Sequence, residues 1–206
     1  MNGAQFLALI AVAAIETQYN HQNSLLGAKR RQFSEQFIVD CDTADWGCGG
    51  GFPQSAMRYV KKLGLVSRAS YPYRSGQTGR RTKCLARKFK VTKRFRPLKN
   101  VKMLSGNIPA IIQFVRHQGP VAAGLWVCRD FMYYTHGIYS NRRCNASTSL
   151  GCHAMAIIGY GTDNERDYWL LRNQWGTNWG LNGYIKMARG VNTCQIETWG
   201  VSAPIV

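Results

Sequence analysis

The spacing of apolar residues predicts helices in the first part of the chain. Residues 6–20 form one apolar stretch of helical length. Residues 55–63 place their apolar side chains on one stripe and their basic side chains off it, and Gly64 ends this pattern. Ser34 is placed to cap a short helix that follows it. From about residue 65 onward, turns dominate, including a Gly/Ser-containing loop at 75–79.

The pattern changes in the second half of the chain. One more helix is predicted over 108–117, with Asn107 as its cap. Short apolar or alternating runs bounded by glycine follow, and they predict antiparallel strands. These runs are 120–127, 138–140, 154–160, 167–172 and 183–188. The order indicates an α+β fold of two lobes with a cleft between them, a helical lobe over 1–104 and a β-rich lobe over 105–206.

Composition adds a strong positive charge to this picture. The 206 residues include 27 Lys and Arg against 10 Asp and Glu, a formal net charge of +17. Residues 80–102 hold 11 basic residues in 23 positions. Such a run attracts anionic polymers through counterion release, and its other interpretation is an ordinary solvated face. Charged residues make up only 18 % of the chain, which argues against disorder.

Seven cysteines indicate an oxidising compartment with some disulfides, and their odd number leaves at least one thiol over.

The apolar run at 6–14 is too short to span a bilayer, and no membrane span is expected. It lacks the basic region of a secretory signal, so a buried helix is favoured over a signal peptide. Asn145-Ala146-Ser147 has the form of an N-glycosylation acceptor.

One histidine is placed for chemistry. His153 stands at the head of an apolar strand that is expected to end in a Gly-Tyr-Gly turn, and Asn173 and Trp175 follow downstream. An Asn carboxamide can orient an imidazole ring through a hydrogen bond, and a nearby Trp can shield that bond from water. A lone histidine at a strand end is otherwise a structural residue.

Several motifs, in a fixed order, resemble the papain/cathepsin family of cysteine peptidases over nearly the whole chain. They are FSEQFIVDC at 33–41, WGCGGGFPQSA at 46–56, YPY at 71–73, PVAAGL at 120–125, GIY at 137–139, CHAMAIIGYG at 152–161 and NQWGTNWGLNGY at 173–184. This resemblance implies a papain-like fold, with His153 and Asn173 at catalytic positions. It also implies a lysosomal or extracellular location and no cofactor or metal.

The resemblance places an unexpected residue at the position of the nucleophile. Aligned without gaps on AVAAIE at 11–16, the family's catalytic cysteine falls on Phe6. A phenyl ring cannot become the thiolate that attacks a carbonyl. The family's oxyanion-hole glutamine falls before the first residue given, and such donors contribute about 10²–10³ in rate. We therefore expect an N-terminally incomplete helical lobe and no catalysis.

The same resemblance assigns the substrate-binding residues. Glycines back the substrate, other residues line the main specificity pocket, and a tryptophan shields the catalytic pair. These positions are Gly50, Gly51, Phe52, Pro53, Gly124, Ala154 and Trp175. Trp199 falls at the floor of the pocket, where the family has a small residue. It either plugs the pocket or packs under the C-terminal tail.

The resemblance further implies two disulfides, Cys41–Cys84 and Cys144–Cys194. Cys48 is expected to be free, because its partner position is Gly3. Cys128 and Cys152 either pair with each other or stay reduced. Cys152 directly precedes His153, which makes a productive attack geometry unfavourable, so it is not expected to replace the nucleophile.

The favoured hypothesis is a catalytically inactive papain-like homologue that binds peptides, or anionic polymers through residues 80–102. One alternative is an active cysteine-type endopeptidase whose N-terminal segment is missing or misassigned, supported by the retained His153, Asn173 and Trp175. The other alternative is a basic polyanion-binding module.

Overall fold

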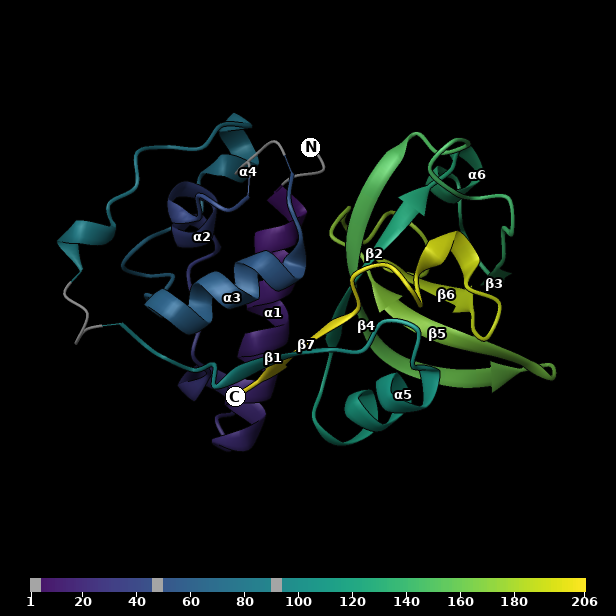
Figure 1. Ribbon diagram of the computed structural model, residues 1–206, viewed down its shortest axis with the longest axis horizontal. Coiled ribbons are helices and arrows are strands. Elements are labelled where there is room, and N and C mark those ends of the chain that lie inside the picture. The colour runs from purple at the N-terminus through teal and green to yellow at the C-terminus, as the bar shows by residue number, and fades with distance from the viewer. Residues whose placement is uncertain (1–4, 46–49, 90–93) are drawn as a thin grey trace. The chain divides into compact units, whose positions relative to one another are not determined.

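The computed structural model describes residues 5–45, 50–89 and 94–206 (Figure 1). The chain divides into two compact units. The first comprises Met1–Lys102 together with Pro204–Val206, and the second comprises Met103–Ala203. The order of helices and strands confirms the α+β class predicted from the sequence.

Three helices build the core of the first unit. Helix α1 spans Gln5–Gln22 and packs against α2 (Glu35–Cys41) and α3 (Pro53–Leu63). Buried apolar side chains of these helices include Ile10, Ile15, Phe37, Met57 and Val60. Burial of such apolar side chains contributes about 1.5–3 kcal/mol each, so these side chains stabilise the packing of the three helices. All three helices were predicted at these places.

Local capping explains where these helices begin and end. Ser34 Oγ accepts a hydrogen bond from the backbone N–H of Phe37 (2.9 Å) and donates one to the carbonyl oxygen of Tyr71 (2.6 Å). The first bond satisfies an N–H that a helix start leaves without a partner. Gly64 ends α3 with a φ of 77°, a conformation that favours glycine.

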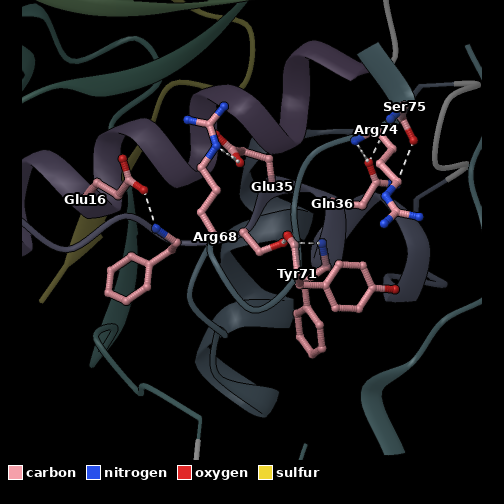
Figure 2. A network of polar contacts seen from close by, with 10 residues as sticks. Glu16, Glu35, Gln36, Arg68, Tyr71, Arg74 and Ser75 are labelled. Carbon is pink, nitrogen blue, oxygen red and sulfur yellow. Dashed lines mark hydrogen bonds and ion pairs between the residues drawn. The ribbon is translucent and has the colours of Figure 1, made fainter. Parts of the chain in front are cut away.

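One short helix replaces a predicted loop. Residues Ser75–Thr78 form α4, and its start is held by a distant side chain. Gln36 Oε1 accepts hydrogen bonds from the backbone N–H groups of Arg74 and Ser75, each 2.8 Å long (Figure 2). The cap comes from 38 and 39 positions earlier in the chain, so local sequence does not reveal it. The first unit also contains 3-10 turns at Gly27–Lys29 and Ala86–Lys88.

The end of the chain is bound into the first unit. The backbone N–H of Val206 donates to Gln18 Oε1 of α1 (2.9 Å). The N–H of Lys99 donates to the carbonyl oxygen of Ile205 (2.7 Å). These bonds explain why Pro204–Val206 belong with the helices.

The second unit is built on a sheet. Its helices are α5 (Ile108–His117), capped by Asn107, and the short α6 (Arg129–Met132), and a 3-10 turn spans Thr193–Gln195. The strands of the sheet are β1 (Asn100–Met103), β2 (Val121–Val127), β3 (Ile138–Tyr139), β4 (Gly151–Asp163), β5 (Arg166–Arg172), β6 (Tyr184–Ala188) and β7 (Ser202–Ile205). Residues 100–102 of β1 and 204–205 of β7 belong to the first unit. They hydrogen-bond in the order β1-β7-β2-β4-β5-β6-β3.

The sheet differs from the sequence prediction in three ways. First, β3 pairs with β6 in parallel, because the long stretch between them lets the chain return in the same direction. Second, β4 continues through Gly159 and Gly161, where a turn was expected, with a register shift between Ile157 and Gly159. Glycine inside a strand commonly accompanies such an irregularity. Third, β1, β7 and α6 were not predicted.

None of the helices in the described part of the chain is long and apolar enough to cross a membrane.

Candidate functional site

The second unit brings His153 and Asn173 together at neighbouring strand ends. His153 lies near the start of β4, opposite Leu125 of β2. Asn173 directly follows β5, whose last residue, Arg172, pairs with Ala156 of β4. This antiparallel register carries the end of β5 toward the start of β4. Both side chains are buried, with His153 6 % exposed and Asn173 5 % exposed.

The hydrogen bonds around Asn173 assign the proton on the imidazole. Asn173 Oδ1 lies 2.9 Å from the backbone nitrogen of Gln174, which can only donate, so the atom at this position is an oxygen. The same oxygen lies 2.9 Å from His153 Nε2, and this nitrogen must therefore carry the hydrogen. In the neutral ring the lone pair is then on Nδ1. The arrangement is that of a base whose orientation is set by a carboxamide.

Aromatic rings cover the pair. The Trp175 ring stacks on His153 with centroids 5.0 Å apart and planes at 22°. Trp179 contacts the edge of Trp175, and Phe131 of α6 packs against both tryptophans. Sequence patterns did not reveal Phe131, because the short α6 that positions it has no periodic signal of its own. Trp175 therefore shields one face of the His153 ring, and Phe131 and Trp179 hold Trp175 in place.

This burial changes the acid–base chemistry of His153. Burial lowers the pKa of His153 to about 4, and the hydrogen bond with Asn173 offsets part of that effect. The ring is therefore neutral at physiological pH and in mildly acidic compartments.

The cysteine next to the histidine points elsewhere. Cys152 is exposed whereas His153 is buried, as expected for neighbours on a strand, whose side chains alternate between faces. Cys128 is buried and its Sγ lies 3.7 Å from the carbonyl oxygen of Thr148, to which it donates. Both thiols are free, so the alternative in which they pair is wrong.

A second group of predicted residues lies together on β2 and β4. Gly124 and Ala154 are directly opposite in the register. The carbonyl oxygen of Trp199 accepts a hydrogen bond from the N–H of Gly124 (2.9 Å), and a Cβ on Gly124 would stand 3.2 Å from the Trp199 indole. Trp199 is half-buried and stacks on Trp126, with centroids 4.5 Å apart. The indole of Trp199 therefore covers Gly124.

The other predicted site residues belong to the first unit. Phe6 lies in the first turn of α1. Gly50 and Gly51 precede α3, Phe52 is its N-cap residue with a 41 % exposed side chain, and Pro53 is its buried first residue.

An aspartate that sequence reasoning missed supports this segment. Asp45 Oδ1 accepts a hydrogen bond from the N–H of Phe52 (3.0 Å), and a Cβ on Gly51 would overlap the Asp45 carboxylate. Burial raises the pKa of Asp45 to about 6, and the nearby Asp42 carboxylate adds to the effect. Only glycine fits at position 51 while this carboxylate lies beside it.

The structure contains the disulfides Cys41–Cys84 and Cys144–Cys194. Cys48 and Gly3 lie outside the described residues, so the expectation of a free Cys48 stays a prediction. Among residues 5–45, 50–89 and 94–206, no group of three or more His, Cys, Asp and Glu side chains could hold a metal ion.

Known proteins resemble this chain in sequence. The family model described as papain family cysteine protease matches residues 6–204. Cathepsin B-like CP2 of Giardia intestinalis is 36 % identical over 177 residues, which cover 84 % of this chain and 57 % of the relative. Pro-cathepsin H of Mus musculus is 34 % identical over 177 residues, covering 84 % and 51 %. The chain thus spans little more than half the length of these relatives.

Solved structures agree with the sequence match. Digestive procathepsin L2 proteinase from Tenebrio molitor larval midgut superimposes with a TM-score of 0.83 at 33 % identity, covering 98 % of this chain and 61 % of that one. Bromelain from Ananas comosus, in complex with the E64 inhibitor, gives a TM-score of 0.80 at 27 % identity, covering 98 % and 89 %. On the match of motifs, family model and fold, the chain belongs to the papain family of cysteine proteases.

Proposed function

We propose that this chain is a catalytically inactive member of the papain family that binds extended peptides without cleaving them. The observation that carries the proposal is the residue at the nucleophile position. The AVAAIE segment of α1 aligns with the family motif without gaps, and this register puts Phe6 where the attacking cysteine belongs. Covalent peptide cleavage requires a thiolate there, and a phenyl ring supplies neither a lone pair nor a titratable proton.

The state of His153 is consistent with this proposal. A base that has drawn a proton from a neighbouring thiol is an imidazolium, stabilised by the thiolate beside it. Burial instead keeps His153 neutral, with a pKa lowered to about 4. An oriented neutral base without an attacking group cannot form an acyl-enzyme.

Neither free thiol in the described part of the chain is placed to take over the attack. Cys152 points to the face of β4 opposite that of His153, and Cys128 is buried with a hydrogen bond to Thr148. A nucleophile and its base must approach within about 3 Å, which neighbours on opposite faces of a strand do not do.

The family's peptide-contacting positions support binding of an extended peptide. Gly50 and Gly51 offer backbone without side chains, and Asp45 holds the N–H of Phe52 in place. Trp199 covers Gly124 and leaves little room for a large side chain beside it. We therefore propose that the bound peptides carry small side chains at this position.

Two disulfides support residence in an oxidising compartment, which agrees with a lysosomal or extracellular location.

The oriented His153–Asn173 pair favours a second candidate function, an active cysteine-type endopeptidase. The charge of +17 favours a third, binding of anionic polymers.

A labelling experiment tests the inactive state. The purified chain is incubated with E64, the inhibitor present in the bromelain structure, and its intact mass is measured beside peptide hydrolysis. We expect no hydrolysis and no adduct that depends on His153. Phe6→Cys should gain an adduct, and Phe6→Cys with His153→Ala should lose it. Hydrolysis by the unmodified chain that disappears in His153→Ala would overturn the proposal and establish the peptidase.

A further inference from the structure

The positive charge of the chain is concentrated in the first unit. Nineteen of the 27 Lys and Arg residues lie there, with five of the ten Asp and Glu residues, so this unit carries a formal +14 of the total +17. The second unit carries +3.

The five acidic side chains of the first unit face its interior. Asp40, Asp42 and Glu35 are buried, and Glu16 and Asp45 are half-buried. The Asp40 carboxylate alone accepts hydrogen bonds from Gln36, Tyr71 and Thr82, including both the N–H and the hydroxyl of Thr82. In the described part of the unit, Glu35 is the one carboxylate among them that forms an ion pair with a basic side chain.

The basic side chains are mostly exposed and lack acidic partners. Within the described part of the first unit, the ion pair between Arg68 and Glu35 is the only one (Figure 2). Arg94 is half-buried, and its guanidinium donates to the carbonyl oxygens of Leu63, Ala86 and Phe89. Arg94 therefore links residues 86–89 to the end of α3.

Five exposed basic residues gather around α3 and β1. Lys61 and Lys62 lie three and four residues after Arg58, which places the three side chains on one side of α3. Ala56, Met57 and Val60 are buried on the other side. Lys61 Nζ donates to Asn100 Oδ1 (3.1 Å), so β1 lies beside this side of the helix.

Two further residues extend the group. Lys102 is two residues after Asn100 on β1 and therefore on the same face of the strand. Arg96 lies at the end of α3, where its Cγ would stand 3.4 Å from a Cβ on Gly64. We call Arg58, Lys61, Lys62, Arg96 and Lys102 the α3–β1 basic surface. Figure 1 allows the reader to follow α3 and β1 within the first unit.

We propose that the α3–β1 basic surface binds a sulfated polysaccharide. This inference rests on the polyanion-binding candidate function above, and it does not depend on whether the chain cleaves peptides. Closely spaced ammonium and guanidinium groups displace counterions from a linear polymer of high charge density. Arginine adds bidentate hydrogen bonds to the oxygens of the anion.

The surface fits a sulfated polymer better than a single-stranded nucleic acid. Proteins that bind single strands combine basic groups with exposed aromatic rings on which bases stack. The neighbouring rings are partly buried and already packed, Tyr59 against Phe37 and Phe95 against Phe33. The disulfide Cys41–Cys84 in the same unit also indicates an oxidising compartment.

Heparin binding by the full chain, measured between 50 and 300 mM salt, tests the proposal. The variant Arg58→Gln/Lys61→Gln/Lys62→Gln should lose about tenfold or more in affinity, and the slope of log K against log salt should fall by about two to three. The exposed triple Arg142→Gln/Arg143→Gln/Arg166→Gln removes the same charge from the second unit and should lose far less. Circular dichroism confirms that each variant is folded.

A third variant and a competitor make the outcome decisive. Arg80→Gln/Lys83→Gln/Arg87→Gln removes three exposed charges of the first unit outside the proposed surface. Equal losses of heparin affinity in all three triple variants would mean that binding follows the overall charge of the chain, and would overturn the proposed binding surface. Displacement of heparin by a single-stranded oligonucleotide at equal or lower concentration would overturn the choice of polymer. The E64 experiment is unaffected by either result, so the two proposals fail separately.

Discussion

The indole of Trp199 lies parallel to that of Trp126, with ring centroids 4.5 Å apart and planes at 16°. This stack connects the turn after Cys194 to strand β2, and Trp126 Nε1 strengthens the link by donating to Gln195 Oε1 (2.9 Å). Trp199 thus packs against Trp126, and the plugging of the family's specificity pocket by its indole stays a prediction. The residue packs on Trp126 and in doing so covers Gly124.

Trp199→Ala should uncover Gly124 and improve binding of peptides with large apolar side chains, because the space against β2 becomes available. Loss of a half-buried ring should also lower the free energy of unfolding by about 2 kcal/mol. Calorimetric titration with peptide amides that differ in one side chain measures the first effect, and urea unfolding measures the second. Leu150→Ala, an exposed apolar position in the same unit, serves as the control. Unchanged selectivity among the peptides would contradict the proposed cover.

His153 should make stability fall in acid. Its pKa is about 4 in the folded chain and about 6.5 when unfolded, so the unfolded state binds the additional proton between these values. The neutral imidazole therefore contributes fully to the free energy of unfolding above pH 6.5. This contribution is lost as the pH falls toward 4, by up to about 3 kcal/mol. Urea unfolding from pH 4 to 8 should show this slope reduced in His153→Gln. The exposed His136→Gln should keep it. Parallel curves for all three proteins would contradict a neutral, buried imidazole.

Glu16 should act in the opposite direction. Burial raises the pKa of Glu16 to about 7, although the N–H of Phe33 donates a short hydrogen bond (2.5 Å) to Oε1 (Figure 2). The folded state therefore holds a proton that the unfolded state has released above about pH 4.5, and stability is lost as the pH rises from 4.5 to 7.

In Glu16→Gln this loss should disappear, because an amide oxygen can still accept from Phe33 and carries no charge. The variant should gain stability relative to the unmodified chain as the pH rises, measured by thermal unfolding at pH 5 and pH 8. Glu165→Gln replaces an exposed carboxyl and should shift both values equally. The same pH dependence in Glu16→Gln as in the unmodified chain would exclude a protonated Glu16.

Removing the disulfide Cys41–Cys84 should destabilise the first unit. The bridge closes a loop over a sequence separation of 43, and its loss through Cys41→Ser/Cys84→Ser should cost about 2–5 kcal/mol. Guanidinium unfolding measures the difference. Cys152→Ser changes an exposed free thiol and should leave stability within about 0.5 kcal/mol. A larger effect of Cys152→Ser would indicate a bond that the structure lacks.

The elements predicted from sequence are those whose signals are local. Helix α1 follows from a long apolar run and α3 from apolar periodicity, and the caps at Ser34 and Asn107, which mark the starts of α2 and α5, follow from residue type. The helix at Ser75–Thr78 was missed because its cap is Gln36, which lies far away in the chain.

The candidate site could be predicted only in part for the same reason. Motif order indicated His153 and Asn173, and in the structure His153 Nε2 lies 2.9 Å from Asn173 Oδ1. The support of Phe52 by Asp45, the stacking of Trp175 on His153 and the packing of Phe131 against Trp175 are tertiary contacts. A single sequence carries no local pattern for such contacts.

The inward orientation of the acidic side chains has a consequence for a chain that passes through an acidifying compartment. The outer charge of the first unit comes from lysine and arginine, whose ordinary pKa values lie above 10, and its only histidine is His21. Acidification from pH 7.5 to 5 therefore leaves this exterior almost unchanged, while Glu16 and Asp45 take up protons inside. An anionic ligand bound at neutral pH would therefore stay bound during acidification, whereas the two interior carboxyl groups would become protonated.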